Sequence, residues 1–211
     1  MVPVSDLTHD ELVRIYGRWL PRTPRDAAAL FEGYQGRWWI AGGWALEAFT
    51  GVSRPHGDLD PSIPRHELPL LRRHLAGKLD LWSADQETLR ILLPEDADGD
   101  SLADSCENVW ARDGGDAPWQ YDIILMDVTD DRWVFKRDSR ISRPVDEILW
   151  LLDGIPYLRP EVQLLHKAAG LRPKDQADYA ATWPRLDAPA RRWLHEAIKT
   201  AHPGHPWLDE S

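Results

Sequence analysis

Hydrophobic and polar positions follow two different periods along the chain, so strands and helices are predicted to be mixed in one fold. Short apolar runs rich in aromatic and β-branched residues are typical of strands. They occupy residues 37–43, 58–63, 78–84, 88–94, 107–113, 118–128 and 131–137. Apolar residues spaced three and four apart indicate helices instead, over residues 8–20, 26–34, 44–51, 65–77, 160–170, 173–183 and 188–201.

Local start and stop signals support several of these elements. Thr8 and Glu11 have the spacing of a capping box, and Gly51 is placed to end the helix over residues 44–51. Pro69 fits a helix only in its first turn, because it has no amide hydrogen to donate. Residues 129–131 are turn formers and predict a hairpin between the strands on either side.

The order of the elements predicts an α+β fold. A mixed β-sheet with flanking helices is expected over residues 1–142, followed by a small C-terminal helical segment over residues 143–211. The last ten residues of that segment, 202–211, are rich in His and Pro and are predicted to be a poorly packed end. The sequence has no internal repeat.

Composition narrows the class of protein. The 211 residues are 43% hydrophobic, which is sufficient for one packed core, and no apolar run approaches the roughly 20 residues of a membrane span. The N-terminus lacks the basic and apolar regions of a signal peptide. The single cysteine, Cys106, is predicted to be a small packing residue, because it has no partner for a disulfide or a cysteine-based zinc site. We therefore predict a cytoplasmic protein with no membrane partner.

Charge disfavours a polymer partner. The formal net charge of −10 would repel the phosphate backbone of a nucleic acid, although a local basic groove remains open. Twelve tryptophans are many for this length. Some could line a ligand pocket, but packing in the core accounts for most of them.

Two carboxylates one residue apart need a cation. Asp58 and Asp60 flank Leu59, so on a strand both acids share one face. Mg²⁺ is the natural occupant, since it takes carboxylate oxygens together with substrate phosphates. Asp122, a charge inside an apolar strand, is the preferred third ligand, and Asp127 at the end of that strand ranks lower.

Paired glycines supply a second candidate site. Gly42 and Gly43 lie between a predicted strand and a predicted helix, where backbone amides and the helix dipole favour a phosphate. Each signal alone is also typical of ordinary structure, a tight turn for the glycines and a solvated turn for the acids. Their succession, strand, Gly-Gly, helix, Asp-x-Asp and then an acid in an apolar strand, is more specific.

That succession resembles a known family. The stretch "AGGWALEAFTGVSRPHGDLD" is similar to the nucleotidyltransferase superfamily with the DNA polymerase beta-like fold, and within it to the aminoglycoside 2''-adenylyltransferases and the lincosamide nucleotidyltransferases. The similarity continues more loosely in "YDIILMDVTDDRW" and "PEVQLLHKAAGLRPKDQADY" and touches most of residues 38–186. Residues 1–142 would then be the nucleotidyltransferase core, and the helical segment would wall the acceptor pocket.

The resemblance implies a function for single residues. Asp58 and Asp60 would bind Mg²⁺, and Asp122 would join the metal site or act as general base toward an acceptor hydroxyl. The phosphates of a nucleoside triphosphate, most simply ATP, would contact the residues Gly42, Gly43, Lys167 and Lys174. The reaction implied is Mg-dependent transfer of a nucleoside monophosphate to a hydroxyl of a small molecule, for which an aminoglycoside or a lincosamide antibiotic is the candidate.

Several nearby residues keep two interpretations. Arg54 could contact a phosphate or pair with an acid, whereas His56 is assigned to orienting its loop. Pro61 removes a strand hydrogen bond and suggests an edge or a bulge beside the acids. Both Lys167 and Lys174 could equally be surface charges. The acidic run over residues 95–104 is predicted to be solvated, although it could attract a polycationic acceptor.

Three alternatives stay open at this point. The same core could act on a protein or tRNA, as in nucleotidyltransferase toxin and antitoxin systems. A non-catalytic or regulatory nucleotide-binding protein could keep the fold without turnover. An acidic domain with no ligand would gain or keep stability when both Asp58 and Asp60 are replaced, because their repulsion is relieved. The sequence leaves the oligomeric state open.

Overall fold

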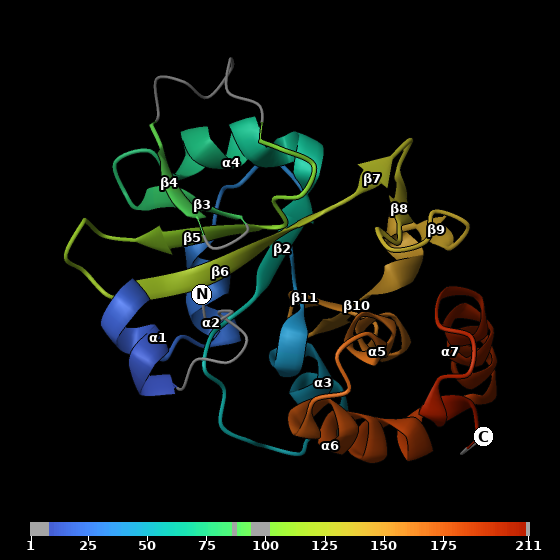
Figure 1. Cartoon of the computed structure of the whole chain (residues 1–211). Coiled ribbons are helices and arrows are strands. Elements are labelled where there is room, and N and C mark those ends of the chain that lie inside the picture. The colour runs from blue at the N-terminus through green and yellow to red at the C-terminus, as the bar shows by residue number, and fades with distance from the viewer. Residues whose placement is uncertain (1–8, 86–87, 94–101, 210–211) are drawn as a thin grey trace. The chain divides into compact units, whose positions relative to one another are not determined.

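A computed structural model describes residues 9–85, 88–93 and 102–209, and their contacts gather into two units. The first unit comprises residues up to 38 together with residues 56–126. The second comprises residues 39–55 together with residues 127–211. Figure 1 follows the chain through both. The predicted boundary between residues 142 and 143 falls inside strand β9 (Ser142–Pro144) of the second unit and stays a prediction as a domain boundary.

The first unit is built on five strands in the order β2-β6-β5-β3-β4. Strand β2 runs parallel to β6, and the remaining neighbours are antiparallel. Their bounds are Pro61–Pro64 for β2, Asp80–Asp85 for β3, Thr88–Leu92 for β4, Asn108–Arg112 for β5 and Trp119–Met126 for β6. Alternating burial along β5 and a nearly buried β6 give the sheet one packed face and one half-exposed face.

Three helices accompany this sheet. Helix α1 (His9–Tyr16) ends before Gly17, whose φ of 90° requires a glycine, so Trp19 and Leu20 lie beyond the helix predicted to include them. Helix α2 (Pro24–Leu30) begins with a capping box at Thr23. Helix α4 (Leu68–Leu75) carries Pro69 in its first turn, as expected. Thr8 of the other predicted capping box lies outside the described residues.

The second unit contains two small groups of strands. Strand β1 (Trp39–Ile40) pairs in parallel with β11 (Ile155–Leu158), which forms an antiparallel hairpin with β10 (Leu149–Leu152). A three-stranded sheet joins β7 (Val128–Thr129), β8 (Arg132–Val134) and β9. The predicted hairpin turn is confirmed, because Asp130 and Asp131 both have positive φ between β7 and β8.

Helix α5 (Pro160–Ala168) is the centre of the second unit. It packs against α3 (Gly42–Thr50), α6 (Pro173–Thr182) and α7 (Ala188–Ala201), and nearly every one of its residues is buried. The three C-terminal helices thus follow the predicted ranges closely. Residues 149–158, placed in a helical segment by the sequence, form the β10–β11 hairpin instead.

The C-terminal residues correct another prediction. Residues 202–209 pack firmly, because the Trp207 ring, 2% exposed, stacks on Tyr179 with 4.2 Å between ring centroids. Its indole N–H donates to Gln176 Oε1 at 2.9 Å. The predicted poorly packed end is therefore wrong for the described part of the tail.

Among the described residues, none of the helices has the length and apolar character that crossing a membrane requires.

Candidate metal centre and phosphate-binding residues

The first unit brings two aspartates to the start of a buried strand. Asp58 and Asp60 lie in the extended segment just before β2, not on the strand itself as predicted. Leu59 between them is fully buried, and its carbonyl accepts a hydrogen bond from the Asp122 amide at 3.0 Å. Pro61 is the first residue of β2, a position that tolerates the missing amide hydrogen, so the strand is neither broken nor bulged there.

The side chains of Asp58, Asp60 and Asp122 converge. One oxygen from each of the three carboxylates can be chosen so that all lie within 4.8 Å of one another. Across the described ranges, this is the one group of three or more metal-ligating side chains with that spacing. Asp58 is exposed and the other two are half-buried, so the cluster opens to solvent on one side.

Asp122 anchors the cluster on the sheet. Its Oδ1 accepts a hydrogen bond from the side-chain Nδ2 of Asn108 at 2.7 Å. Burial, opposed by the hydrogen bonds from Asn108 and Trp110 and reinforced by the Asp58 charge, raises the pKa of Asp122 to about 7. Without a cation, folding thus favours the protonated form of this carboxyl.

These residues fit Mg²⁺. The donors are hard carboxylate oxygens, and their spacing allows one ion to contact all three. A cation there would neutralise the repulsion between the half-buried Asp122 and the two acids beside it. Asp127 lies beyond the end of β6 and its carbonyl accepts from the Val134 amide in the β7–β8 region. It is not a member of the cluster.

Replacing Asp122 by Asn is expected to stabilise the metal-free protein. A carboxyl whose folded pKa exceeds its unfolded value near 3.8 binds more protons when folded, so its contribution is favourable at acidic pH and is lost as pH rises through the folded pKa. Asp122→Asn should raise the free energy of unfolding by about 1–2 kcal/mol at pH 8. Chemical unfolding in EDTA between pH 5 and pH 8 measures it; an unchanged pH slope in the variant would contradict the argument.

Gly42 begins helix α3 in the second unit. Its φ of 64° is left-handed, which explains why a glycine is required. Its amide donates to Gln163 Oε1 of helix α5 at 2.7 Å. Gly43 follows in the first helical turn, where amides have no acceptor within the helix. A phosphate would therefore meet the amides after Gly42 rather than that of Gly42 itself.

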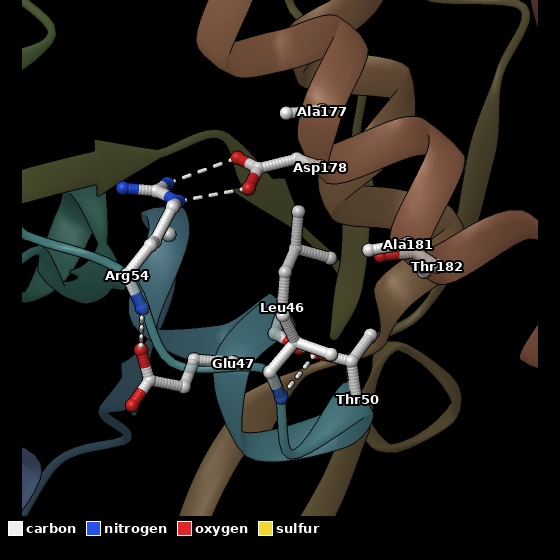
Figure 2. A pocket seen from close by; sticks show the side chains of 10 residues that line it. Leu46, Glu47, Thr50, Arg54, Ala177, Asp178, Ala181 and Thr182 are labelled. Atoms are coloured by element: carbon white, nitrogen blue, oxygen red, sulfur yellow. Dashed lines mark hydrogen bonds and ion pairs between the residues drawn. The ribbon is translucent and has the colours of Figure 1, made fainter.

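Arg54 and Lys167 are held by acids. The Arg54 guanidinium makes two hydrogen bonds of 2.9 Å to the Asp178 carboxylate, as Figure 2 shows, which decides between its two interpretations in favour of an acid partner. Lys167, 7% exposed, lies 3.1 Å from Asp175 and 3.0 Å from Asp178. Its predicted contact with nucleotide phosphates stays a prediction, and Lys174 is exposed at the start of α6.

A small pocket of about 120 Å³ lies next to this network, between α3 and α6. Figure 2 shows Leu46 and Thr50 of α3 facing Ala181 and Thr182 of α6 across it, with the Arg54–Asp178 pair at one side. Gly43 also lines it. Its charged groups are paired with one another, so the pocket offers a mostly apolar lining.

Sequence reasoning missed Asn108 and Gln163. Both carry a side-chain amide, and each is a hydrogen-bond partner of a predicted site residue. Asn108 adjoins the apolar run Val109-Trp110-Ala111, and a polar residue in such a place is a signal that could have found it. Gln163 gives no such signal, because α5 contains other polar residues. In the predicted acidic run, Glu95, Asp96, Asp98 and Asp100 lie outside the described residues, whereas Asp104 is exposed.

The chain has a nucleotidyltransferase-type fold, as the sequence predicted, and this conclusion comes from comparison with solved structures. It is similar to the solution structure of the antibiotic-resistance factor ANT(2'')-Ia, at 17% identity and a TM-score of 0.51, over 83% of this chain and 89% of that one. The crystal structure of ANT(2'')-Ia in complex with adenylyl-2''-tobramycin matches at 14% identity and a TM-score of 0.52, over 83% and 94%. At these identities the likeness concerns the fold alone. No protein-family model and no curated protein matches the chain.

Proposed function

We propose that this protein is a Mg-dependent nucleotidyltransferase that moves a nucleoside monophosphate from a nucleoside triphosphate, ATP by preference, to a hydroxyl of a small molecule. The observation that carries the proposal is the convergence of Asp58, Asp60 and Asp122 on a nucleotidyltransferase-type fold. In the reaction, the acceptor oxygen forms a bond to the α-phosphorus and the bond from that phosphorus to the bridging oxygen breaks, releasing pyrophosphate. The hydroxyl proton passes to a carboxylate.

The three carboxylates divide two tasks in this scheme. Asp58 and Asp60 would hold Mg²⁺, which, when bound, neutralises the charge that develops on the phosphate oxygens. Asp122 is suited to accept the hydroxyl proton, because its environment already favours the protonated form. Asn108 fixes the orientation of that carboxylate through one of its two oxygens.

The phosphate contacts are assigned by the same proposal. Gly42 supplies the left-handed turn, and the amides from Gly43 onward would donate to the triphosphate. Lys174, exposed on α6, could add a charge, and Lys167 would contribute only if a phosphate competes with its two acid partners. These four residues belong to the second unit, whereas the three carboxylates belong to the first.

The acceptor proposed from the sequence is an aminoglycoside or a lincosamide antibiotic. The similar structure that holds adenylyl-2''-tobramycin fits the first of these classes. The alternative class is a nucleotide-binding protein without turnover, or a toxin-type enzyme that modifies a protein or tRNA. Pro61 no longer favours the inactive alternative, because it begins β2 without distorting it.

Nucleotide binding is the first test. The thermal midpoint is measured with ATP, GTP, CTP and UTP, each with and without Mg²⁺. A ligand at a hundred times its dissociation constant stabilises the folded protein by about 2.7 kcal/mol, which for this length shifts the midpoint by roughly 5–10 °C. We expect such a shift for one triphosphate, only with Mg²⁺, and its loss when Asp58 and Asp60 are both replaced by Asn.

The matched control is the double variant Asp113→Asn with Asp116→Asn. Both residues are exposed in the same unit, and the variant removes the same charge without touching the cluster. It should keep the full shift. A shift that needs no metal, or one that survives loss of Asp58 and Asp60, would refute the proposed site. Pyrophosphate release with aminoglycosides and lincosamides then separates turnover from simple binding.

A further inference from the structure

The half-exposed face of the first unit's sheet carries more than the carboxylate cluster. Asp122 on β6 lies directly opposite Trp110 on β5, and Trp110 lies opposite Trp82 on β3. Residues directly opposite each other share a face of the sheet. Arg112, two residues after Trp110, follows on the same half-exposed side of β5. One row of side chains therefore leads from the candidate base to an arginine.

Arg112 is held by aromatic rings rather than by an acid. Its guanidinium carbon lies 4.7 Å from the ring centroid of Trp82 and 4.1 Å from that of Trp119. The planes of these two rings are nearly perpendicular, at 87°. Trp82 and Trp119 thus form a notch that holds the guanidinium. Asp80 is its cross-strand neighbour, yet no ion pair joins Arg112 to a carboxylate in the described part of the chain.

This arginine keeps donor capacity for a ligand. Its Nε is buried without a hydrogen-bond partner among the residues that the structure describes, and the partly exposed side chain leaves the two terminal nitrogens as the donors that a ligand can reach. A guanidinium offers five N–H donors in a planar fork that matches carboxylate and phosphate oxygens. Two indoles can fix its position without neutralising its charge. A fixed, uncompensated cation in a chain of net charge −10 is suited to an anionic ligand.

Other aromatic rings pack around the notch and hold its residues in place. Trp110 packs against the edges of Tyr16 and Trp19, with centroids 5.9 and 5.1 Å apart, and against Trp119 at 5.2 Å. The position of Arg112 relative to Asp122 is thereby fixed within one unit.

We propose that Arg112 is a specificity-determining residue that binds a phosphate or carboxylate group of the acceptor whose hydroxyl lies at Asp122. This inference rests on the proposed nucleotidyl transfer but replaces the proposed acceptor, because neither an aminoglycoside nor a lincosamide carries a phosphate or carboxylate group. The acceptor is a small hydroxyl compound that also carries an anionic group. A polycationic aminoglycoside would bring like charge against Arg112 and is disfavoured.

The test measures binding of inorganic phosphate and of acetate at constant ionic strength, without metal or nucleotide. Isothermal titration calorimetry gives both dissociation constants, because the twelve tryptophans of the chain prevent intrinsic fluorescence from reporting on Trp82 and Trp119 alone. Replacement of Arg112 by Gln should weaken phosphate binding at least fivefold, and Arg112→Lys, which keeps the charge but loses the fork, should weaken it less. Arg25→Gln, an exposed arginine of the same unit, is the control and should bind like wild type.

Equal phosphate binding by wild type and Arg112→Gln would overturn the proposal. The lysine variant keeps the test valid if the glutamine variant does not fold. A second measurement separates the acceptor from the donor nucleotide. The dissociation constant of ATP with Mg²⁺ should be the same in both Arg112 variants as in wild type. A tenfold increase would overturn the proposal and assign Arg112 to the donor nucleotide. Because phosphate binding is measured without metal, a failure here is separate from a failure of nucleotide binding at Asp58 and Asp60.

Discussion

Replacing Asp58 by Asn is expected to reduce nucleotidyl transfer by at least about a thousandfold, a loss of about 4 kcal/mol of transition-state stabilisation. Asn keeps the shape of the side chain but removes the charge that would hold Mg²⁺ beside Asp60 and Asp122. The rate of pyrophosphate release is measured with the triphosphate and acceptor that wild type uses best. Because Asp58 is exposed, the variant should fold normally.

Asp116→Asn serves as the control for this loss. It removes one exposed negative charge from the same unit and should stay within about twofold of wild type. Added Mn²⁺ provides a second check, since a weakened oxygen site is filled more readily by a metal with higher affinity. If Asp58→Asn retained a tenth or more of the wild-type rate, the carboxylates would not be the metal site.

Replacing Trp207 by Ala is expected to cost about 3–4 kcal/mol of stability and to lower the thermal midpoint by roughly 10 °C. The ring is almost completely buried and stacks on Tyr179 at an interplanar angle of 11°. Its loss leaves a cavity and removes the partner of the Gln176 side chain. Thermal and chemical unfolding both measure the change.

Leu151→Ala is the matched control for Trp207→Ala. Leu151 is a large apolar residue of the same unit that is 70% exposed, so its truncation should change stability by no more than about 0.5 kcal/mol. Trp207→Phe, which keeps a ring for Tyr179, should recover part of the loss. Equal stability of Trp207→Ala and wild type would mean that residues 202–209 do not contribute to the fold in solution.

The sequence predicted the fold where its signals are local. Helices α6 and α7 start at Pro173 and after Asp187, where proline and an N-cap aspartate fix the first turn. The tail was misjudged because Trp207 gains its burial from Tyr179, a partner that sequence spacing does not reveal. The β10–β11 hairpin was missed although Asp153-Gly154, both with positive φ, is a strong turn signal.

The candidate site also contains residues that the sequence could predict and partners that it could not. The Asp-x-Asp pattern and the lone acid in an apolar strand singled out Asp58, Asp60 and Asp122, whose side chains converge in the folded protein. Their role as a metal site stays a prediction. The partners of Gly42 and Arg54 could not be predicted, since Gln163 and Asp178 are distant in sequence. Arg112 was not recognised because only the folded sheet brings Trp82 and Trp119 around it.

The path of the chain has a consequence for protein synthesis. Helix α3 belongs to the second unit, yet Gly42 bonds a residue 121 positions later and Arg54 one 124 positions later. A ribosome adding about 5–20 residues per second exposes this apolar helix for several seconds before its partners exist. The nascent chain is therefore most open to aggregation, and to chaperones that prevent it, until helices α5 and α6 emerge.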